Sequence, residues 1–243
     1  MRKDITIARV PWNLKDFAKI IAATFLIPYG LLISVVSLSH YHLLPVAVTR
    51  SIKSGDIWFN LIFEVVVVLV EISMILWLVK KYKIGLSDFG LRRFKIFKAA
   101  LYILFALVMF TALVSVVFII VTIIFPNFNA TQSQAIADEF GTSRIGIILS
   151  FVMTVIIAPV IEEIYFRGLM LPAVTKRFGW GMGVIISSSL FAVLHMQANV
   201  MVYTFILGVF LCFMYIRLKS IIPGILLHAI NNSIAFAALF LIK

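Results

Sequence analysis

Seven long apolar segments constrain the fold of this chain more than any other feature of its sequence. A helix needs about 20 mainly apolar residues to cross the hydrocarbon core of a bilayer. Backbone polar groups in lipid must be satisfied within the segment, so each segment is expected to be a helix. The segments are roughly 17–38, 57–79, 98–125, 145–170, 180–198, 200–217 and 221–242. They predict an all-α, polytopic membrane protein of about seven transmembrane helices.

The composition agrees with a membrane protein and argues against a soluble one. Hydrophobic residues make up 63% of the chain and charged residues 13%, whereas soluble proteins have about 45–50% and 25%. The net charge of +11 indicates orientation, because Lys and Arg collect in cytoplasmic loops. No soluble segment interleaves basic runs with aromatic residues, so no nucleic-acid partner is expected. The single cysteine, Cys212, excludes an intrachain disulfide and a Cys-based metal site.

Most Lys and Arg residues lie in cytoplasmic segments if the N-terminus is placed inside. This distribution predicts a cytoplasmic N-terminus and an external C-terminus. We expect two regions: 1–125, N-terminal transmembrane helices with a basic cytoplasmic loop, and 145–240, a second membrane domain. The loop YKIGLSDFGLRRFK, residues 82–95, is amphipathic and basic. It suits an anionic leaflet, or it is an ordinary loop that sets topology.

The stretch IEEIYFRG, residues 161–168, places ionisable groups within an apolar segment. Such groups are expensive in a bilayer and by default indicate a functional site. Glu163 and Arg167 are four residues apart, so they can form an ion pair on one helical face. Glu162 is rotated by about 100° from Glu163 and has no local partner. The spacing therefore predicts a structural role for Glu163 and leaves Glu162 available for chemistry.

Two later segments add imidazole and amide groups. His195 lies in the fifth apolar segment, and His228 and Asn232 share a face of the seventh. A carboxylate beside a neutral imidazole can hold a water and take its proton. A second imidazole and an amide can donate hydrogen bonds to a developing oxyanion. Glu162 with His195, facing His228 with Asn232, would form a set of groups for amide hydrolysis by an activated water.

The same residues allow plainer interpretations. The ion pair can be structural, and each histidine can be a hydrogen-bonding residue in helix packing. Two histidines and a glutamate can bind zinc, although the H-E-x-x-H pattern is absent. Glu64 and Glu71 share a face of the second segment and, with Glu162, can line a proton or ion path. The alternatives are thus a non-enzymatic membrane immunity or regulatory protein that acts by binding, and a transporter.

Three short motifs occur in order on three separate apolar segments. They are E-E-x-x-x-R at Glu162, Glu163 and Arg167, F-x-x-x-H at Phe191 and His195, and H-x-x-x-N at His228 and Asn232. Together they resemble the CPBP family, which comprises the type II CAAX prenyl endopeptidases and the related bacterial bacteriocin-immunity (Abi) membrane proteases. The resemblance covers roughly 145–240, and LSDFGLRRF is similar to a segment often found ahead of that domain.

The resemblance implies an intramembrane glutamic endopeptidase in a bacterial plasma membrane. It implies no metal and no cofactor, a peptide or membrane-protein substrate, and a role in bacteriocin self-immunity or peptide processing. The implied residues are Glu162 as general base aided by His195, His228 and Asn232 as the oxyanion hole, and Glu163 and Arg167 as supporting groups.

The expected depths of these side chains in the membrane argue against a role for His195 beside Glu162. Glu162 and His228 are expected about eight residues from the cytoplasmic face, whereas His195 is about sixteen residues beyond Gly179. At about 1.5 Å per residue, the expected difference in depth is about 12 Å. If the depths differ by this amount, His195 cannot assist Glu162.

Overall fold

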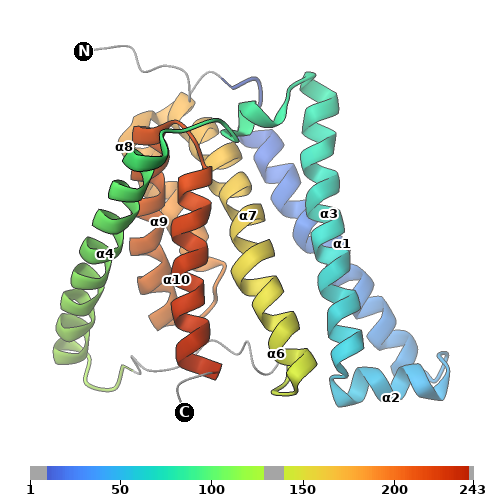
Figure 1. Cartoon of the computed structure of the whole chain (residues 1–243). Helices are drawn as coiled ribbons and strands as arrows, with labels where there is room; N and C mark the ends of the chain where they lie inside the picture. The colour runs from blue at the N-terminus through green and yellow to red at the C-terminus, as the bar shows by residue number, and fades with distance from the viewer. Residues whose placement is uncertain (1–9, 129–139, 241–243) are drawn as a thin grey trace. The chain divides into compact units, whose positions relative to one another are not determined.

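The computed structural model of the protein describes residues 10–128 and 140–240, and all regular structure in these ranges is helical (Figure 1). Within these two ranges, six helices are long and apolar enough to cross a membrane. They are Leu14–His40, Ile57–Tyr82, Ile96–Ile124, Arg144–Val193, Ala198–Leu218 and Ile222–Phe240. The predicted class, a helical polytopic membrane protein, is confirmed. The orientation of the two termini stays a prediction.

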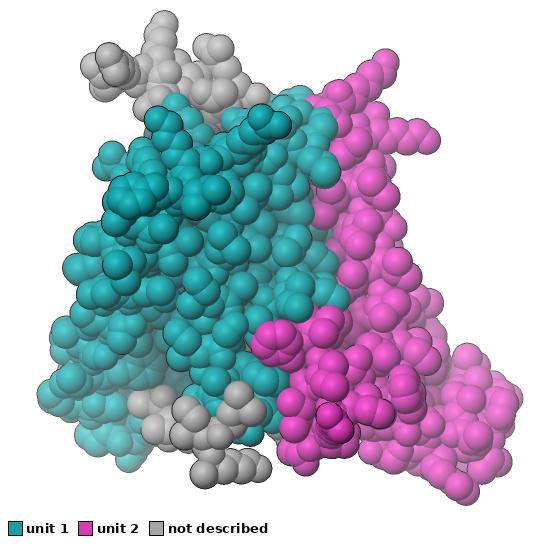
Figure 2. All heavy atoms as spheres, in the orientation of Figure 1, with its two compact units in different colours: residues 1–14, 85–134, 154–243 teal, residues 15–84, 135–153 magenta. Residues whose placement is uncertain are grey.

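The contacts divide the chain into two compact units, which Figure 2 colours separately. The smaller unit, residues 15–84 and 135–153, holds α1 (Leu14–His40), α2 (Val46–Ser54), α3 (Ile57–Tyr82) and α6 (Arg144–Phe151). The larger unit, residues 1–14, 85–134 and 154–243, holds η1 (Leu86–Phe89), α4 (Ile96–Ile124), α7 (Ala158–Glu163), η3 (Ile164–Met170), α8 (Leu171–Val193), α9 (Ala198–Leu218) and α10 (Ile222–Phe240). The segment η2 (Val152–Ile157) crosses the division. The expected regions 1–125 and 145–240 stay a prediction.

The fourth and fifth predicted spans form an antiparallel hairpin that reverses at Gly179. Gly179 has φ +80° inside α8, a conformation that a residue with a Cβ rarely adopts. Across the hairpin, Ser187 Oγ donates a hydrogen bond to Phe166 O over 3.1 Å. A Cβ on Gly183 would lie 2.3 Å from Thr175 Oγ1, so a glycine is needed for this close approach. The hairpin explains why Arg144–Val193 has 50 residues, far more than one span requires.

Small residues also bring α8 and α9 together in the larger unit. A Cβ on Gly208 of α9 would lie 3.0 Å from Ser188 Cβ of α8. Ser187 and Ser188 are both fully buried. They act as small packing residues, in the manner common between membrane helices.

The LSDFG segment packs on protein within the larger unit. Phe89 is fully buried and stacks on Trp12, with 5.4 Å between ring centroids. A Cβ on Gly168 would lie 2.7 Å from Phe89 O, and Trp12 Nε1 donates to Leu169 O over 2.9 Å. Part of the loop expected on a leaflet or in water thus supports the helix that carries Glu162.

In the smaller unit, α1 and α3 are joined by a polar contact at one end. Asp16 of α1 is buried and forms an ion pair with Lys81 of α3. Tyr82 Oη donates to the same carboxylate over 2.7 Å. The start of α1 therefore meets the end of α3, so the two helices are antiparallel neighbours. The short helix α2 between them was not predicted from the apolar pattern.

Candidate active site

The two glutamates lie on a short α-helix between two π-helical segments, whose turns are wider. The six-residue α7 ends at Glu163 and is flanked by the π-helical segments η2 and η3. Pro159 occupies the first turn of α7. Because a proline removes one backbone donor and its ring crowds the preceding turn, the wider η2 before it accommodates the disruption.

Glu163 and Arg167 form a buried ion pair, as their spacing predicts. Arg167 Nη1 lies 2.7 Å from Glu163 Oε1, and the two side chains are 0% and 1% exposed. Arg167 Nη2 donates to Gly208 O over 3.3 Å, and the guanidinium carbon lies 4.5 Å from the centre of the Phe191 ring. A buried charge needs such partners because leaving it unpaired is costly. The pair therefore ties η3 to α8 and α9.

Glu162 differs from Glu163 in exposure, as the rotation between neighbouring helical residues requires. Its side chain is 31% exposed, and its Oε2 lies 3.6 Å from His228 Nε2 of α10. At that separation the contact is too long for a direct hydrogen bond. A water can hydrogen-bond to both atoms across such a gap.

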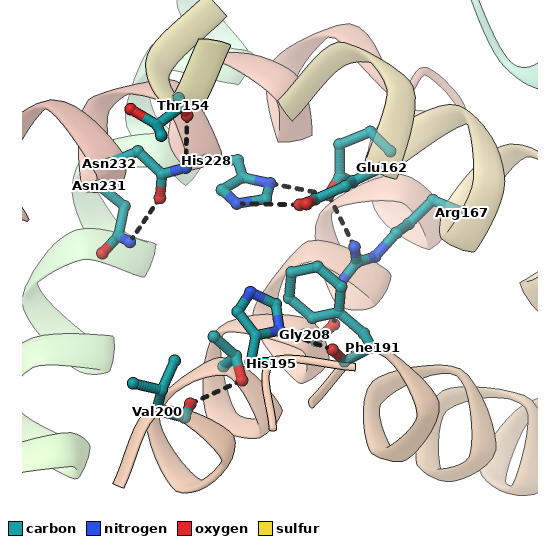
Figure 3. A network of polar contacts seen from close by, with 12 residues as sticks. Thr154, Glu162, Arg167, Phe191, His195, Val200, Gly208, His228, Asn231 and Asn232 are labelled. Carbon is teal, nitrogen blue, oxygen red and sulfur yellow. Dashed lines mark hydrogen bonds and ion pairs between the residues drawn. The ribbon is translucent and has the colours of Figure 1, made fainter. Parts of the chain in front are cut away.

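His228 lies between the two carboxylates. It is 2% exposed, and its Nδ1 lies 3.3 Å from Glu163 Oε1 without hydrogen-bond geometry. Figure 3 shows its imidazole directed toward Glu162. A neutral imidazole has only one N–H, so it can donate to one of these carboxylates at a time.

His195 reaches the same group of side chains through Phe191. The Phe191 ring makes edge-to-face contacts with both imidazoles, at centroid distances of 5.1 Å to His195 and 5.6 Å to His228. The two histidines thus share one aromatic neighbour, and the difference in depth expected between His195 and Glu162 stays a prediction. No direct contact between His195 and Glu162 is found among the described residues.

The backbone contact of His195 indicates which of its nitrogens carries the proton. His195 Nδ1 lies 2.9 Å from Phe191 O. A carbonyl oxygen only accepts hydrogen bonds, so Nδ1 is the donor in this contact. In the neutral form, Nε2 is then left as an acceptor that can receive a hydrogen bond from water.

A chain of amide contacts fixes the orientation of Asn232. Asn232 Nδ2 donates to Thr154 O over 2.9 Å, and Asn231 Nδ2 donates to Asn232 Oδ1 over 3.3 Å. Tyr203 Oη of α9 donates in turn to Asn231 Oδ1. Asn231 therefore bonds to a neighbouring helix. An amide nitrogen has two hydrogens, and the contact with Thr154 uses one of those on Asn232.

These side chains lie in the part of the chain that matches a known family. Residues 144–234 match the family model described as type II CAAX prenyl endopeptidase Rce1-like. Residues 144–234 form an Rce1-like domain. The predicted family resemblance is thereby confirmed for this part of the chain. No curated protein and no solved structure matches the chain.

The match to the Rce1-like family supports the assignment of this domain to the CAAX-type intramembrane proteases. A membrane-embedded protease of this type would act on peptides within a lipid bilayer. The domain contains all the residues expected to catalyse or support peptide hydrolysis, namely Glu162, Glu163, Arg167, His195, His228 and Asn232. Within it, Glu162 contacts His228 and not His195. The roles assigned to the individual residues stay predictions.

Sequence reasoning missed several residues that shape this site of the Rce1-like domain. Phe191 was noted only as part of a motif, although its ring contacts Arg167 and both histidines. Tyr203 gave no signal, because a tyrosine in an apolar run resembles any packing residue. Gly224 places α10 close to Glu163, since a Cβ there would lie 3.2 Å from Glu163 Oε2. A glycine near the start of an apolar helix is a usable signal for such an approach.

A zinc site would need at least three suitable ligands close together. In residues 10–128 and 140–240, no three His, Cys, Asp or Glu side chains are grouped so that they could hold a metal ion. The contacts of His228 join it to two carboxylates, one of which already pairs with Arg167.

Proposed function

We propose that this protein is a membrane endopeptidase whose Rce1-like domain hydrolyses a peptide bond near the membrane with a water activated by Glu162. The observation that carries the proposal is the unequal state of the two neighbouring glutamates. Glu163 is buried and neutralised by Arg167, whereas Glu162 is partly exposed and faces an imidazole. Only Glu162 can both receive a water and remain next to a substrate.

In this mechanism, Glu162 takes a proton from water, and the resulting hydroxide attacks the carbonyl carbon of the peptide. His195 Nε2 accepts a hydrogen bond from the second O–H of that water, which stays intact, and so orients the water. The carbonyl oxygen becomes an oxyanion that accepts hydrogen bonds from His228 and from the second N–H of Asn232. Glu162 then passes its proton to the leaving amine as the C–N bond breaks, giving a carboxylic acid and an amine.

The buried ion pair serves this reaction by positioning the working groups. Arg167 holds Glu163, which fixes α7 and leaves Glu162 turned toward His228. The resemblance of the motifs favours a place in a bacterial plasma membrane, and either processing of a peptide signal or self-immunity to a bacteriocin.

A cleavage assay tests this function directly. The purified full chain in lipid nanodiscs is incubated with a diverse peptide pool and a chelator, and products are identified by mass spectrometry. We expect Glu162→Gln to lower the rate by about 10²–10⁴-fold, the usual contribution of a general base. Glu64→Gln removes a half-buried glutamate from α3 and is expected to leave cleavage unchanged.

Other outcomes of the same assay separate the alternatives. Full cleavage by the Glu162→Gln protein would contradict the general-base assignment. Loss of cleavage on adding the chelator would favour a metal-dependent reaction. Equal sensitivity at Glu64 would favour an ion or proton path over a local catalytic site.

A further inference from the structure

A hollow of about 410 Å³ opens in the larger unit, where α4 begins and α9 ends. It is lined by Arg93, Phe94, Lys95, Lys98, Arg217 and Leu218. Four of these six side chains are cationic and none is acidic. The hollow lies apart from the candidate active site, and neither the family match nor the proposed peptidase reaction assigns it a role.

The four cations have no acidic partner within residues 10–128 and 140–240. All four are exposed, and none takes part in an ion pair found among the described residues. Four like charges around one small hollow repel each other. A bound anion relieves this repulsion, so the hollow has the chemistry of an anion site.

Aromatic rings lie next to two of the cations. Tyr102 of α4 and Phe213 of α9 stack with 6.1 Å between ring centroids. Lys98 Nζ lies 5.6 Å from the centre of the Tyr102 ring, and Arg217 Cζ lies 5.1 Å from that of Phe213. This arrangement holds both cations at the same end of the two helices, with apolar surface next to them.

The chain leading into the hollow is fixed in place before any ligand binds. Ile221 N donates to Gly90 O over 2.9 Å, and Ser220 Oγ donates to Arg92 O over 2.7 Å. A Cβ on Gly90 would lie 2.7 Å from the Tyr215 ring. Arg93 therefore follows a backbone that is tied to the turn between α9 and α10. Such preorganisation lowers the entropic cost of binding.

The face of α4 that continues from the hollow is apolar and uncovered. Phe97, Leu101, Leu104 and Phe105 are exposed at 78%, 52%, 61% and 54%. An anionic group with long hydrocarbon chains matches this combination of a cationic hollow and an exposed apolar helix face. Basic pockets between transmembrane helices bind phosphate headgroups of lipids for the same reason.

We propose that this hollow binds the phosphate headgroup of an anionic phospholipid, with the acyl chains lying along α4. The site anchors the start of α4 and the end of α9 at one leaflet. It is independent of peptide cleavage, because none of its lining residues belongs to the candidate active site.

Native mass spectrometry of the full chain in a neutral detergent tests the proposal. The probes are phosphatidylglycerol and phosphatidylcholine of identical acyl chains, so that only the headgroup charge differs. We expect the wild type to prefer phosphatidylglycerol. The variant with both Lys98→Gln and Arg217→Gln should bind it roughly 25-fold more weakly, because each cation near an anionic group contributes about fivefold.

The matched control removes two exposed cations from another part of the chain. Arg50→Gln with Lys53→Gln changes the net charge equally on α2, and this variant should keep the wild-type preference. The proposal is overturned if wild type binds both lipids equally, or if the control loses as much affinity as the hollow variant. An excess of inorganic phosphate is the last arm of the test. Displacement of the lipid by phosphate would assign the hollow to free phosphate, and retention of the lipid supports the headgroup assignment.

Discussion

The helices around the candidate site and the helices α3 and α4 are all apolar, but the protein covers them to very different extents. In the most apolar stretch of α9, 50% of the residues are buried within the protein, against 11% in the corresponding stretches of α3 and α4. Lipid covers an exposed apolar side chain at no cost, but it offers no partner for a polar one. The two regions therefore differ in which side chains they can carry.

The polar groups follow this difference in burial. Arg167 and His228 are buried among protein groups that contact them, whereas the exposed residues of α4 are largely apolar. Burial inside the protein allows α7 to α10 to carry charges that a lipid-facing helix would not tolerate. The half-buried Glu64 and Glu71 are acidic residues on α3, a helix that is mostly not covered by protein. The Glu64→Gln variant in the cleavage assay above measures whether Glu64 contributes to function.

The largest effect on stability is expected when the positive charge is removed from the buried region. Arg167→Met leaves Glu163 buried without its partner, which typically costs about 3–5 kcal/mol. We expect the free energy of unfolding to fall by that amount. Unfolding can be followed by circular dichroism in dodecyl maltoside with increasing sodium dodecyl sulfate.

Two further variants serve as controls for the loss of the Arg167 charge. Arg50→Met removes an exposed arginine from α2, and its effect should stay within about 0.5 kcal/mol. Combining Glu163→Gln with Arg167→Met removes both charges and should recover part of the lost stability. If Arg167→Met behaves like Arg50→Met, the buried pair does not stabilise the domain.

A pair of glycines offers a smaller and more local test. A Cβ on Gly224 would lie 3.2 Å from Glu163 Oε2 and 3.6 Å from Leu211 Cδ2. Because Arg167 holds the Glu163 side chain, the carboxylate cannot easily move away. Gly224→Ala should therefore lower the free energy of unfolding by about 1–3 kcal/mol, the usual cost of overpacking.

Gly181 of α8 is the matched control, because a Cβ there meets no atom within 4 Å. Gly181→Ala should raise stability by about 0.5–1 kcal/mol, since alanine loses less backbone entropy than glycine in a helix. The same detergent titration measures both variants. Opposite signs would support the close approach of α10 to Glu163, and equal effects would contradict it.

The sequence predicted those features that depend on local spacing. Apolar length predicted the helical membrane class, and the four-residue spacing predicted the ion pair of Glu163 and Arg167. The rotation between Glu162 and Glu163 predicted that Glu162 lacks the ion-pair partner that Glu163 has in Arg167. Each of these follows from the geometry of a single helix, so no information about distant contacts was needed.

The sequence could not predict the individual contacts between helices, or where α8 ends. The contacts of His228 with both carboxylates join positions more than sixty residues apart, and nothing in the motifs fixes that distance. Helix α8 ends at Val193, five residues before the predicted end of the fifth span. The turn that follows contains Leu194 and Met196, which are apolar, and Met196 adopts φ +60° without being glycine. An apolar turn of this kind has none of the usual sequence signals.

The smallest expected effect tests whether the polar chain behind Asn232 matters. Tyr203→Phe removes the hydroxyl that donates to Asn231 Oδ1, and such interhelical hydrogen bonds contribute about 0.6 kcal/mol on average in membrane proteins. Asn231 then holds Asn232 less firmly, so kcat/KM for the peptide found in the cleavage assay should fall by about threefold. Tyr102→Phe on α4 is the control, because no partner for the Tyr102 hydroxyl is found in the described part of the chain. A Tyr203→Phe protein equal to wild type in both stability and cleavage would mean that Asn232 is oriented by Thr154 alone. A loss of cleavage without a loss of stability would instead locate the role of Tyr203 in positioning the amide for the oxyanion.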